Sequence, residues 1–475
     1  MRRGSIIGPL ILIALGILFL LRNVWPDIPV FELLSRYWPF LLIGWGVIRL
    51  FEIFIWASQS KPIPRQGISS GEWTWIILIC VVGLAAHTAH RFVTSFPSGR
   101  AWRGVVMNMG ENYDYTLSSV SEPCPANCRV LIESFRGNAK ITGSPDNEVR
   151  ATGSQRIRSF QKSDADNANR QTPFELVRQG DQLIVRTNQD KVSDRLRVSA
   201  DLEITVPAGA SIEAHGRSGD FDIQNVNGNI DVNSDNAGVR LDNIGGNVRL
   251  DLRRSDSIRA TQIKGNLDLK GRGQDVMLEN IAGQVTLSGT YVGQVDAKNL
   301  AHPLRYTDSR VTLSLEKLPG EMHLSLGDFN AENVIGPIRL DARSSDVHLS
   351  EFTDSLDLEL QRGDVTLRPA KAMPKIDVHT RSGDVDLALP EGAHFDLRAS
   401  TNHGDIRNDF GSPLTVSQSP GRASISGSTG GGAQVRIETN RGDIAIRKAT
   451  GADAPAPLRS HLPSSSDQPL HVQRQ

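Results

Sequence analysis

A short pattern of apolar and polar positions repeats through the second half of the chain. A glycine is followed by one polar residue and then by apolar, polar and apolar residues, as in Gly219-Asp-Phe-Asp-Ile223 and Gly265-Asn-Leu-Asp-Leu269. Apolar side chains at every second position are typical of a β-strand with one buried face. The copies are nine or ten residues apart and begin at residues 219, 228, 237, 246, 256, 265, 274 and 283.

An extra apolar residue follows only every other strand, which indicates that two strands form one coil. The spacing of these residues is 16 to 19 positions, and they are Val226, Ile244, Ile263, Ile281, Leu300, Leu318, Val334 and Phe352. We call them the corner aliphatics, after the seven aliphatic members that precede Phe352, because each is expected to fill a corner of its coil. So short a unit cannot bury its apolar face alone, so coils must stack about 4.8 Å apart. The predicted fold is all-β, a single-stranded parallel β-solenoid (β-helix) with coils of about 18 residues over 211–448.

The segments before and after the solenoid follow the repeat pattern only in part. Residues 129–210 are expected to begin the same sheet system, because Gly137-Asn-Ala-Lys-Ile141 repeats the pattern. Residues 154–172 are predicted to interrupt it as a polar insertion. Residues 449–475 are rich in Ala, Pro and Ser, which predicts a disordered tail.

Three apolar stretches occupy the first hundred residues, at 6–21, 38–56 and 73–93. Each approaches the roughly 20 residues that cross the hydrocarbon core of a membrane. Tryptophan and tyrosine residues flank the stretches, where aromatic rings prefer the boundary with the headgroups. We therefore predict a three-helix transmembrane anchor over 1–95, followed by a juxtamembrane linker over 96–128.

The orientation of this anchor follows from the basic residues of its short loops. The N-terminus and the second loop are predicted to be cytoplasmic because they carry Arg2, Arg3, Lys61 and Arg65. The bias is slight, since Arg91, Arg100 and Arg103 oppose it. Three spans then place the solenoid outside the cytoplasm, periplasmic or extracellular, with the protein multi-pass in the bacterial inner membrane.

Cys124 and Cys128 fit an oxidising compartment, because a C-x3-C pair there can close a small disulfide loop. Two free thiols, or half of a metal site, remain alternatives at this stage. Cys80 lies within a predicted span and is expected to be a small core residue.

Composition changes the picture in two respects. With 52 Lys and Arg against 53 Asp and Glu, the chain has no net charge to draw it to nucleic acid, which we do not expect as a partner. The 43 glycines, 24 prolines and 6% aromatic residues favour a turn-rich β protein over a helical bundle.

Two stretches carry a resemblance to known families. Gly8-Pro-Leu-Ile-Leu-Ile-Ala-Leu-Gly, followed by Tyr37-Trp-Pro-Phe-Leu-Leu-Ile-Gly-Trp-Gly, resembles the LiaF-like transmembrane region of bacterial envelope proteins. Asp201-Leu-Glu-Ile-Thr-Val-Pro-Ala-Gly-Ala, with Arg217-Ser-Gly-Asp and its echoes at Arg381 and Arg441, is similar to the bacterial putative-adhesin β-helix family, a domain of unknown function. The resemblance implies a bacterial envelope protein linked to adhesion or envelope-stress sensing, and it supplies no catalytic motif.

Three short motifs could carry chemistry, and each has a plainer explanation. Gly67-Ile-Ser-Ser-Gly71 matches a nucleophile elbow but lies in a loop between predicted spans, with no strand before it. The tripeptides Arg362-Gly-Asp364 and Arg441-Gly-Asp443 spell an integrin-type motif but occupy an ordinary turn position of the repeat. His87 and His90 share a helix face, yet no third metal ligand is apparent.

Polar residues of the repeat are also explained by folding. Asn229, Asn247 and Asn266 recur at the coil period, with Gln284 next, and are predicted to form a stacked amide ladder. The outward residues expected on the strands that follow Gly228 and its successors contain no carboxylate pair for a hydrolase or lyase. They are Asp231, Arg249, Asp268, Thr286, Arg305, His323, Arg339 and Asp357. No catalytic residue, cofactor or metal ligand is predicted, and we do not expect an enzyme.

Two functions remain open on the sequence. The first is a membrane-anchored envelope protein that displays a non-catalytic solenoid for adhesion, to cell-wall or extracellular polysaccharide or to another envelope protein. The second is an envelope-stress regulator whose membrane spans act on a sensor kinase.

Overall fold

A computed structural model describes residues 110–192 and 196–449, together with four isolated helical positions at Ile43, Val47, Phe54 and Ile77. The described residues form thirty strands, one α-helix, α5 (Lys162–Gln171), and one short 3-10 helix, η1 (Gln189–Lys191). The predicted all-β class of the solenoid region is therefore confirmed.

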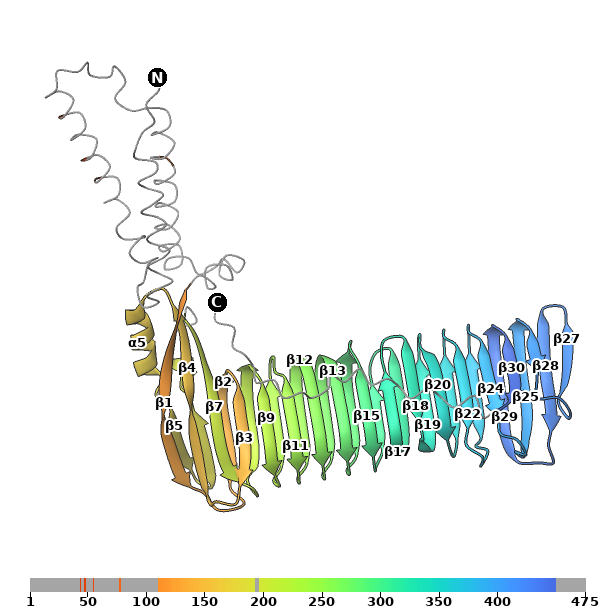
Figure 1. The fold of residues 1–475 in the computed structure, drawn as a ribbon, viewed down its shortest axis with the longest axis horizontal. Coiled ribbons are helices and arrows are strands. Elements are labelled where there is room, and N and C mark those ends of the chain that lie inside the picture. Colours follow the sequence, from red (N-terminus) through yellow and green to blue (C-terminus); the bar gives the residue numbers. More distant parts are fainter. Residues whose placement is uncertain are drawn as a thin grey trace.

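The strands build two long sheets, which we call sheet I and sheet II, stacked face to face along one axis (Figure 1). Sheet I contains, in spatial order, β5 (Glu175–Gln179), β6 (Gln182–Arg186), β2 (Arg129–Arg136), β8 (Ser211–Ser218), β10 (Ile230–Ser234), β12 (Val248–Ile263), β13 (Leu267–Ile281), β14 (Val285–Tyr291), β16 (Leu304–Thr307), β17 (Val311–Leu324), β19 (Ile335–Ala342), β21 (Leu356–Leu360), β23 (Ile376–Thr380), β29 (Ala433–Arg441), β25 (Phe395–His403), β28 (Arg422–Ser428) and β27 (Thr415–Ser419).

Sheet II lies opposite. In spatial order it contains β1 (Glu111–Pro123), β4 (Glu148–Ser159), β7 (Arg197–Pro207), β3 (Ala139–Ser144), β9 (Phe221–Val226), β11 (Val239–Ile244), β12, β13, β15 (Val295–Leu300), β17, β18 (Asp328–Glu332), β20 (Asp346–Phe352), β22 (Val365–Pro369), β24 (Val385–Leu389), β30 (Ile444–Lys448) and β26 (Ile406–Asn408). The long strands β12, β13 and β17 bend and contribute to both sheets.

The core fills the space between the sheets. Inward side chains alternate with outward ones along each strand, as the burial pattern of β10 shows, with Ile230 and Val232 buried and Asp231 exposed. All eight corner aliphatics are at most 1% exposed, and Val226, Ile244, Ile263, Ile281, Leu300 and Leu318 are successive partners in the register of sheet II. They therefore stack along one edge of the molecule, which we call the aliphatic edge.

The prediction of an uninterrupted parallel coil is wrong at β17. This strand runs antiparallel to β16 and β19 in sheet I and to β15 and β18 in sheet II. Two tight turns cause the reversal, closed by hydrogen bonds from the Asp308 N–H to the Val311 carbonyl (2.9 Å) and from the Ser325 N–H to the Asp328 carbonyl (2.8 Å). Inward and outward positions alternate identically in either chain direction, so the sequence pattern gives no sign of the reversal.

The chain order is also broken at both ends of the stack. The coil β2–β3 lies between the later coils β6–β7 and β8–β9, and the last coil, β29–β30, lies between β23–β24 and β25–β26. Beyond β25, the antiparallel strands β28 and β27 cover the end of sheet I. A repeat that resembles all others does not specify which repeat will be its neighbour.

Two predicted segment boundaries need correction. The linker over 96–128 contains strand β1 from Glu111 to Pro123, and the polar insertion over 154–172 contains the second half of β4 as well as α5. Helix α5 covers the outer end of sheet II, where Ala165 and Ala168 pack with Ile157 and Val198 in a small second core. The sequence analysis missed these strands because their outward residues are polar. A strand that is buried on one face needs an apolar residue only at every second position.

The predicted membrane spans at 6–21, 38–56 and 73–93 lie outside the described residues, apart from the four isolated positions, and so does the tail from residue 450. Within 110–192 and 196–449, no helix is both long enough and apolar enough to cross a membrane.

Candidate functional site

The aliphatic edge carries a column of amides that the sequence analysis missed. Asn225, Asn243, Gln262, Asn280, Asn299 and Asn333 each precede a corner aliphatic and adopt a left-handed backbone, with φ between 52° and 59°. Their side chains join neighbouring coils, since Asn243 Nδ2 donates to Asn225 Oδ1 (2.8 Å) and Asn299 Nδ2 donates to Asn280 Oδ1 (2.6 Å). Asparagine tolerates this backbone better than other residues with a side chain, so the column has a structural reason.

The predicted amide ladder lies a few residues further along each coil. The Oδ1 atoms of Asn229, Asn247 and Asn266 accept backbone N–H groups of Asn247, Asn266 and Gln284, each at 2.9 Å. The ladder therefore joins side chain to backbone rather than amide to amide. It satisfies a turn N–H in each coil and leaves these residues no evident ligand-binding role.

The opposite edge carries a column of aspartates. The Oδ1 atom of each aspartate accepts the backbone N–H of the next aspartate in the stack, at 2.8 to 2.9 Å. In spatial order, the column contains Asp346, Asp364, Asp384, Asp443 and Asp405. Both Arg-Gly-Asp tripeptides lie in this column. The preceding Gly363 has φ of 137°, and a Cβ there would lie 1.9 Å from the Ser345 carbonyl oxygen. Turn geometry and coil stacking thus account for both tripeptides.

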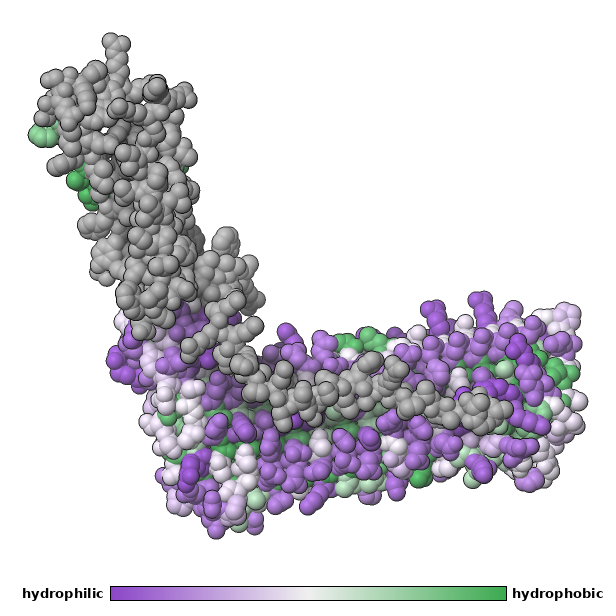
Figure 2. All heavy atoms as spheres, viewed as in Figure 1, coloured by the Kyte–Doolittle hydropathy of each residue, from purple (hydrophilic) through white to green (hydrophobic). Residues whose placement is uncertain are grey.

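The outward face of sheet I presents charged and polar side chains to solvent. One outward row crosses the strands in register through Asp231, Arg249, Asp268, Thr286, Arg305, Ser314, Arg339 and Asp357. Opposite charges are neighbours in three of the seven pairs of this row, and Arg339 Nε lies 3.4 Å from Asp357 Oδ2. The surface in Figure 2 is accordingly mainly hydrophilic along the described stack.

His323 does not lie in this row, contrary to the sequence prediction. Because β17 reverses, His323 lies on sheet II, where its Nδ1 is 2.6 Å from Asp296 Oδ1. Ser314 of β17 occupies the expected place.

One histidine on sheet I contacts two carboxylates. His379 Nε2 lies 3.0 Å from Asp377 Oδ1, and its Nδ1 lies 3.4 Å from Glu438 Oε2. Glu438 also binds Arg436 at 2.6 Å. Sequence reasoning missed this group because Glu438 arrives from the inserted strand β29. The side chains are partly exposed on a flat sheet face, which suits surface pairing better than general acid–base catalysis.

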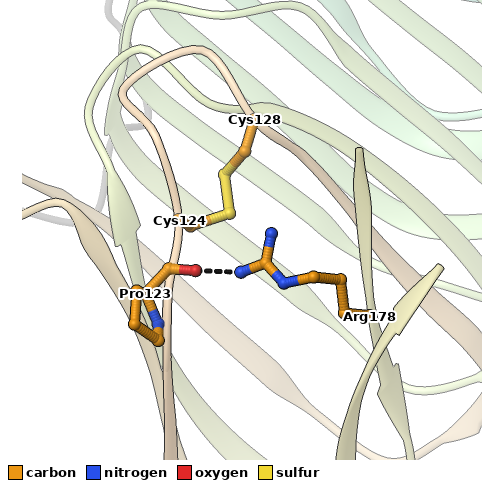
Figure 3. Close-up of a disulfide and its surroundings, with 4 residues drawn as sticks. All are labelled: Pro123, Cys124, Cys128 and Arg178. Atoms are coloured by element: carbon orange, nitrogen blue, oxygen red, sulfur yellow. Dashed lines mark hydrogen bonds between the residues drawn. A yellow bond between two sulfur atoms is a disulfide. The ribbon is translucent and has the colours of Figure 1, made fainter. Parts of the chain in front are cut away.

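Cys124 and Cys128 are joined in a disulfide that closes the turn between β1 and β2 (Figure 3). Both are buried, at 2% and 3% exposure. The guanidinium of Arg178 on β5 donates to the carbonyl oxygen of Pro123 beside it. The turn that leads the chain from sheet II to sheet I is thereby held to its neighbouring strand.

The remaining sequence motifs lie outside the described residues, namely Gly67-Ile-Ser-Ser-Gly71, Cys80, His87 and His90. Among the described residues, no group of three or more His, Cys, Asp or Glu side chains is arranged so that it could hold a metal ion.

Two segments of the chain match known protein families. Residues 141–447 match the family described as Toastrack DUF4097. The chain belongs to this family. Residues 7–94 match the LiaF transmembrane domain, so the Toastrack stack is anchored to a membrane. Both resemblances expected from the sequence are confirmed.

Among solved structures, the chain is similar to one described as that of "a putative cell adhesion protein" from Clostridium sporogenes. The match has 9% identity and a TM-score of 0.17 and covers 72% of this chain and all of that one. A TM-score this low transfers no property to the Toastrack chain. No curated protein matches it.

Proposed function

We propose that this chain is a multi-pass protein of the bacterial inner membrane that holds its β-solenoid outside the cytoplasm. There, the outward face of sheet I binds an extended polymer of the cell envelope, or another envelope protein, without cleaving it. The observation that carries the proposal is the length and regularity of that face. Seventeen strands about 4.8 Å apart extend over roughly 75 Å.

Weak contacts can add along such a face. Each coil offers a similar outward site, so a polymer with its own repeat can contact several coils at once, and its affinity grows through effective concentration rather than through a deep pocket. Alternating charges such as Asp231, Arg249 and Asp268 suit a ligand that carries hydroxyl groups with occasional charges.

The membrane placement is supported by the LiaF match and by the four isolated helical positions. Ile43, Val47, Phe54 and Ile77 are 55% to 73% exposed, which is costly for large apolar side chains in water and natural against lipid. The three predicted spans and the disulfide both favour export of the solenoid, since disulfides persist in oxidising compartments.

The absence of catalysis is proposed because folding explains the polar residues that recur in the repeat. The amides with a left-handed backbone, the amide ladder that begins at Asn229 and the column of aspartates from Asp346 to Asp405 all join neighbouring coils. A hydrolase or lyase would need an acid and a base converging on one ligand site.

The experiment uses the full chain in nanodiscs, incubated with peptidoglycan and with acidic polysaccharides. Co-sedimentation measures binding, and the release of reducing or unsaturated ends measures cleavage. We expect binding without release. Arg249→Glu with Arg305→Glu, both on the outward row of sheet I, should weaken binding about tenfold, as expected for the loss of several charge contacts.

The matched control is Arg240→Glu with Arg259→Glu, which changes the same charge on the outward face of sheet II. It should bind like the wild type. Release of new ends would replace the binding function with an enzymatic one, and equal loss in both double variants would remove sheet I as the binding face.

A further inference from the structure

A cleft of about 750 Å³ lies at the end of the stack where the described chain begins, beside β1, β4 and β7. Five arginines line it: Arg136, Arg156, Arg158, Arg197 and Arg217. None of the described residues in its wall is acidic, and Asn112, Ser199 and Ser218 add amide and hydroxyl groups. Figure 1 shows these strands at the orange and yellow end of the molecule.

The folding of the two sheets brings these arginines together. Arg156 and Arg158 project from β4, Arg197 begins β7, and Arg158 is directly opposite Arg197 in the register of sheet II. Arg136 ends β2 in sheet I, where it is opposite Ser218, the neighbour of Arg217. Like charges directly opposite one another destabilise a sheet, and a bound anion would offset that repulsion.

Two of the five arginines have a described side-chain partner, one acidic and one neutral. Arg156 Nε binds Asp114 Oδ1 at 2.9 Å, and Arg158 Nε donates to the neutral Asn112 Oδ1 at 2.8 Å. Arg197 and Arg217 form no ion pair with any residue in the described ranges. Cationic groups of at least two strands are therefore left facing the cleft.

The wall is held in place by a buried amide. Gln189, 5% exposed, accepts the backbone N–H of Arg136 at its Oε1 (2.8 Å) and donates from its Nε2 to the Arg136 carbonyl (3.0 Å). The backbone that carries Arg136 is thus fixed from both sides. Less side-chain and backbone freedom is then lost when a ligand binds.

We propose that this cleft binds a phosphate group of net negative charge. The planar guanidinium presents several N–H donors in a fork that matches phosphate oxygens, and a set of arginines from several strands can surround one phosphate. The cleft is also close to the anchor along the chain. Asn112 is 18 residues beyond the last residue of the LiaF match, a reach of at most about 60 Å. The arginines could bind the phosphate of an anionic lipid headgroup or a soluble phosphate in the same way.

The test uses the full chain in nanodiscs. In one arm, the discs contain only phosphatidylcholine, and inorganic pyrophosphate is titrated by calorimetry. In the other, discs with and without phosphatidylglycerol are compared by hydrogen exchange of β4 and β7. Binding of pyrophosphate identifies a soluble ligand, and protection that appears only with phosphatidylglycerol identifies a headgroup.

Arg158→Gln with Arg197→Gln should weaken whichever signal the wild type gives by at least about tenfold, and Arg217→Gln alone should weaken it by less. Arg240→Gln with Arg259→Gln is the matched control, because these two arginines are also opposite each other on sheet II but line no part of the cleft. It should leave the signal unchanged. No signal in either arm, or equal loss in the pocket and control variants, would overturn the proposal. The outcome is separate from polymer binding by sheet I, since the two experiments change different residues.

Discussion

Oδ1 of Asp384 accepts the backbone N–H of Asp443 at 2.8 Å, although the two residues are 59 positions apart. The contact exists because the last coil, β29–β30, is inserted between β23–β24 and β25–β26. Along the chain, the strands at the far end of the stack therefore come before the coil that lies between them and β23–β24. The aspartate column marks this spatial order, in which Asp443 precedes Asp405.

Removal of the inserted coil should therefore loosen the whole end of the stack. A chain that ends at Gly432 lacks β29 and β30 and leaves β23 and β25 without the strand that pairs with both of them. We expect hydrogen-exchange protection to fall throughout β25 and β28. A chain that ends at Ala449 should keep the wild-type pattern, and unchanged protection in the shorter chain would contradict the insertion.

The corner aliphatics should be sensitive to charge. Ile263 is 1% exposed, between Ile244 and Ile281 in the sheet II register. Ile263→Asp would bury an unpaired carboxylate, and the free energy of unfolding should fall by several kcal/mol. Asp268→Ser on the outward face should change it by less than ~0.5 kcal/mol. Urea denaturation measures both, and equal midpoints would refute the assignment of inward and outward positions.

The left-handed amides should depend on backbone conformation. Asn243 has φ of 55° and donates to Asn225. Asn243→Val places a β-branched residue where its backbone is strained and should cost about 2 kcal/mol. Asn243→Gly removes the strain and the side-chain hydrogen bond together, and should cost no more than about 1 kcal/mol. The reverse ranking in urea denaturation would show that the side-chain bond matters more than the backbone.

Alkaline pH should destabilise the stack through its buried tyrosines. Burial raises the pKa of Tyr306 to about 12 and also raises the pKa of Tyr291 above its ordinary range. Above pH 10 the unfolded chain loses phenolic protons that the folded chain keeps, so the free energy of unfolding falls as pH rises from 10 to about 12. Tyr291→Phe with Tyr306→Phe should flatten that fall in urea titrations. An unchanged slope would mean that other groups control it.

The sequence predicted the part of the fold that each repeat encodes by itself. Alternation within strands and the recurrence of Val226, Ile244 and Ile263 required strands stacked at the coil period, and the structure has them. The recurrence of apolar residues could not indicate the reversal at β17, since Leu318 fits the corner column in either chain direction. The turn residues Asp308-Ser309-Arg310 and Ser325-Leu326-Gly327 were the available signal.

The candidate sites were less accessible from the sequence. The five cleft arginines come from four strands, and Arg136 and Arg197 line one cavity only because β2 and β7 belong to out-of-order coils. His379 meets Glu438 for the same reason. Pairing between distant strands, rather than local pattern, creates both groups.

Placement of the solenoid outside the cytoplasm is the claim on which polymer binding depends. The most direct test is a reporter enzyme, active only outside the cytoplasm, fused after Lys448 at the end of β30. We predict an active reporter, and no activity from a cytoplasm-only reporter fused at the same residue. Activity of the cytoplasmic reporter alone would contradict the account, because the outward face of sheet I would then never meet the envelope.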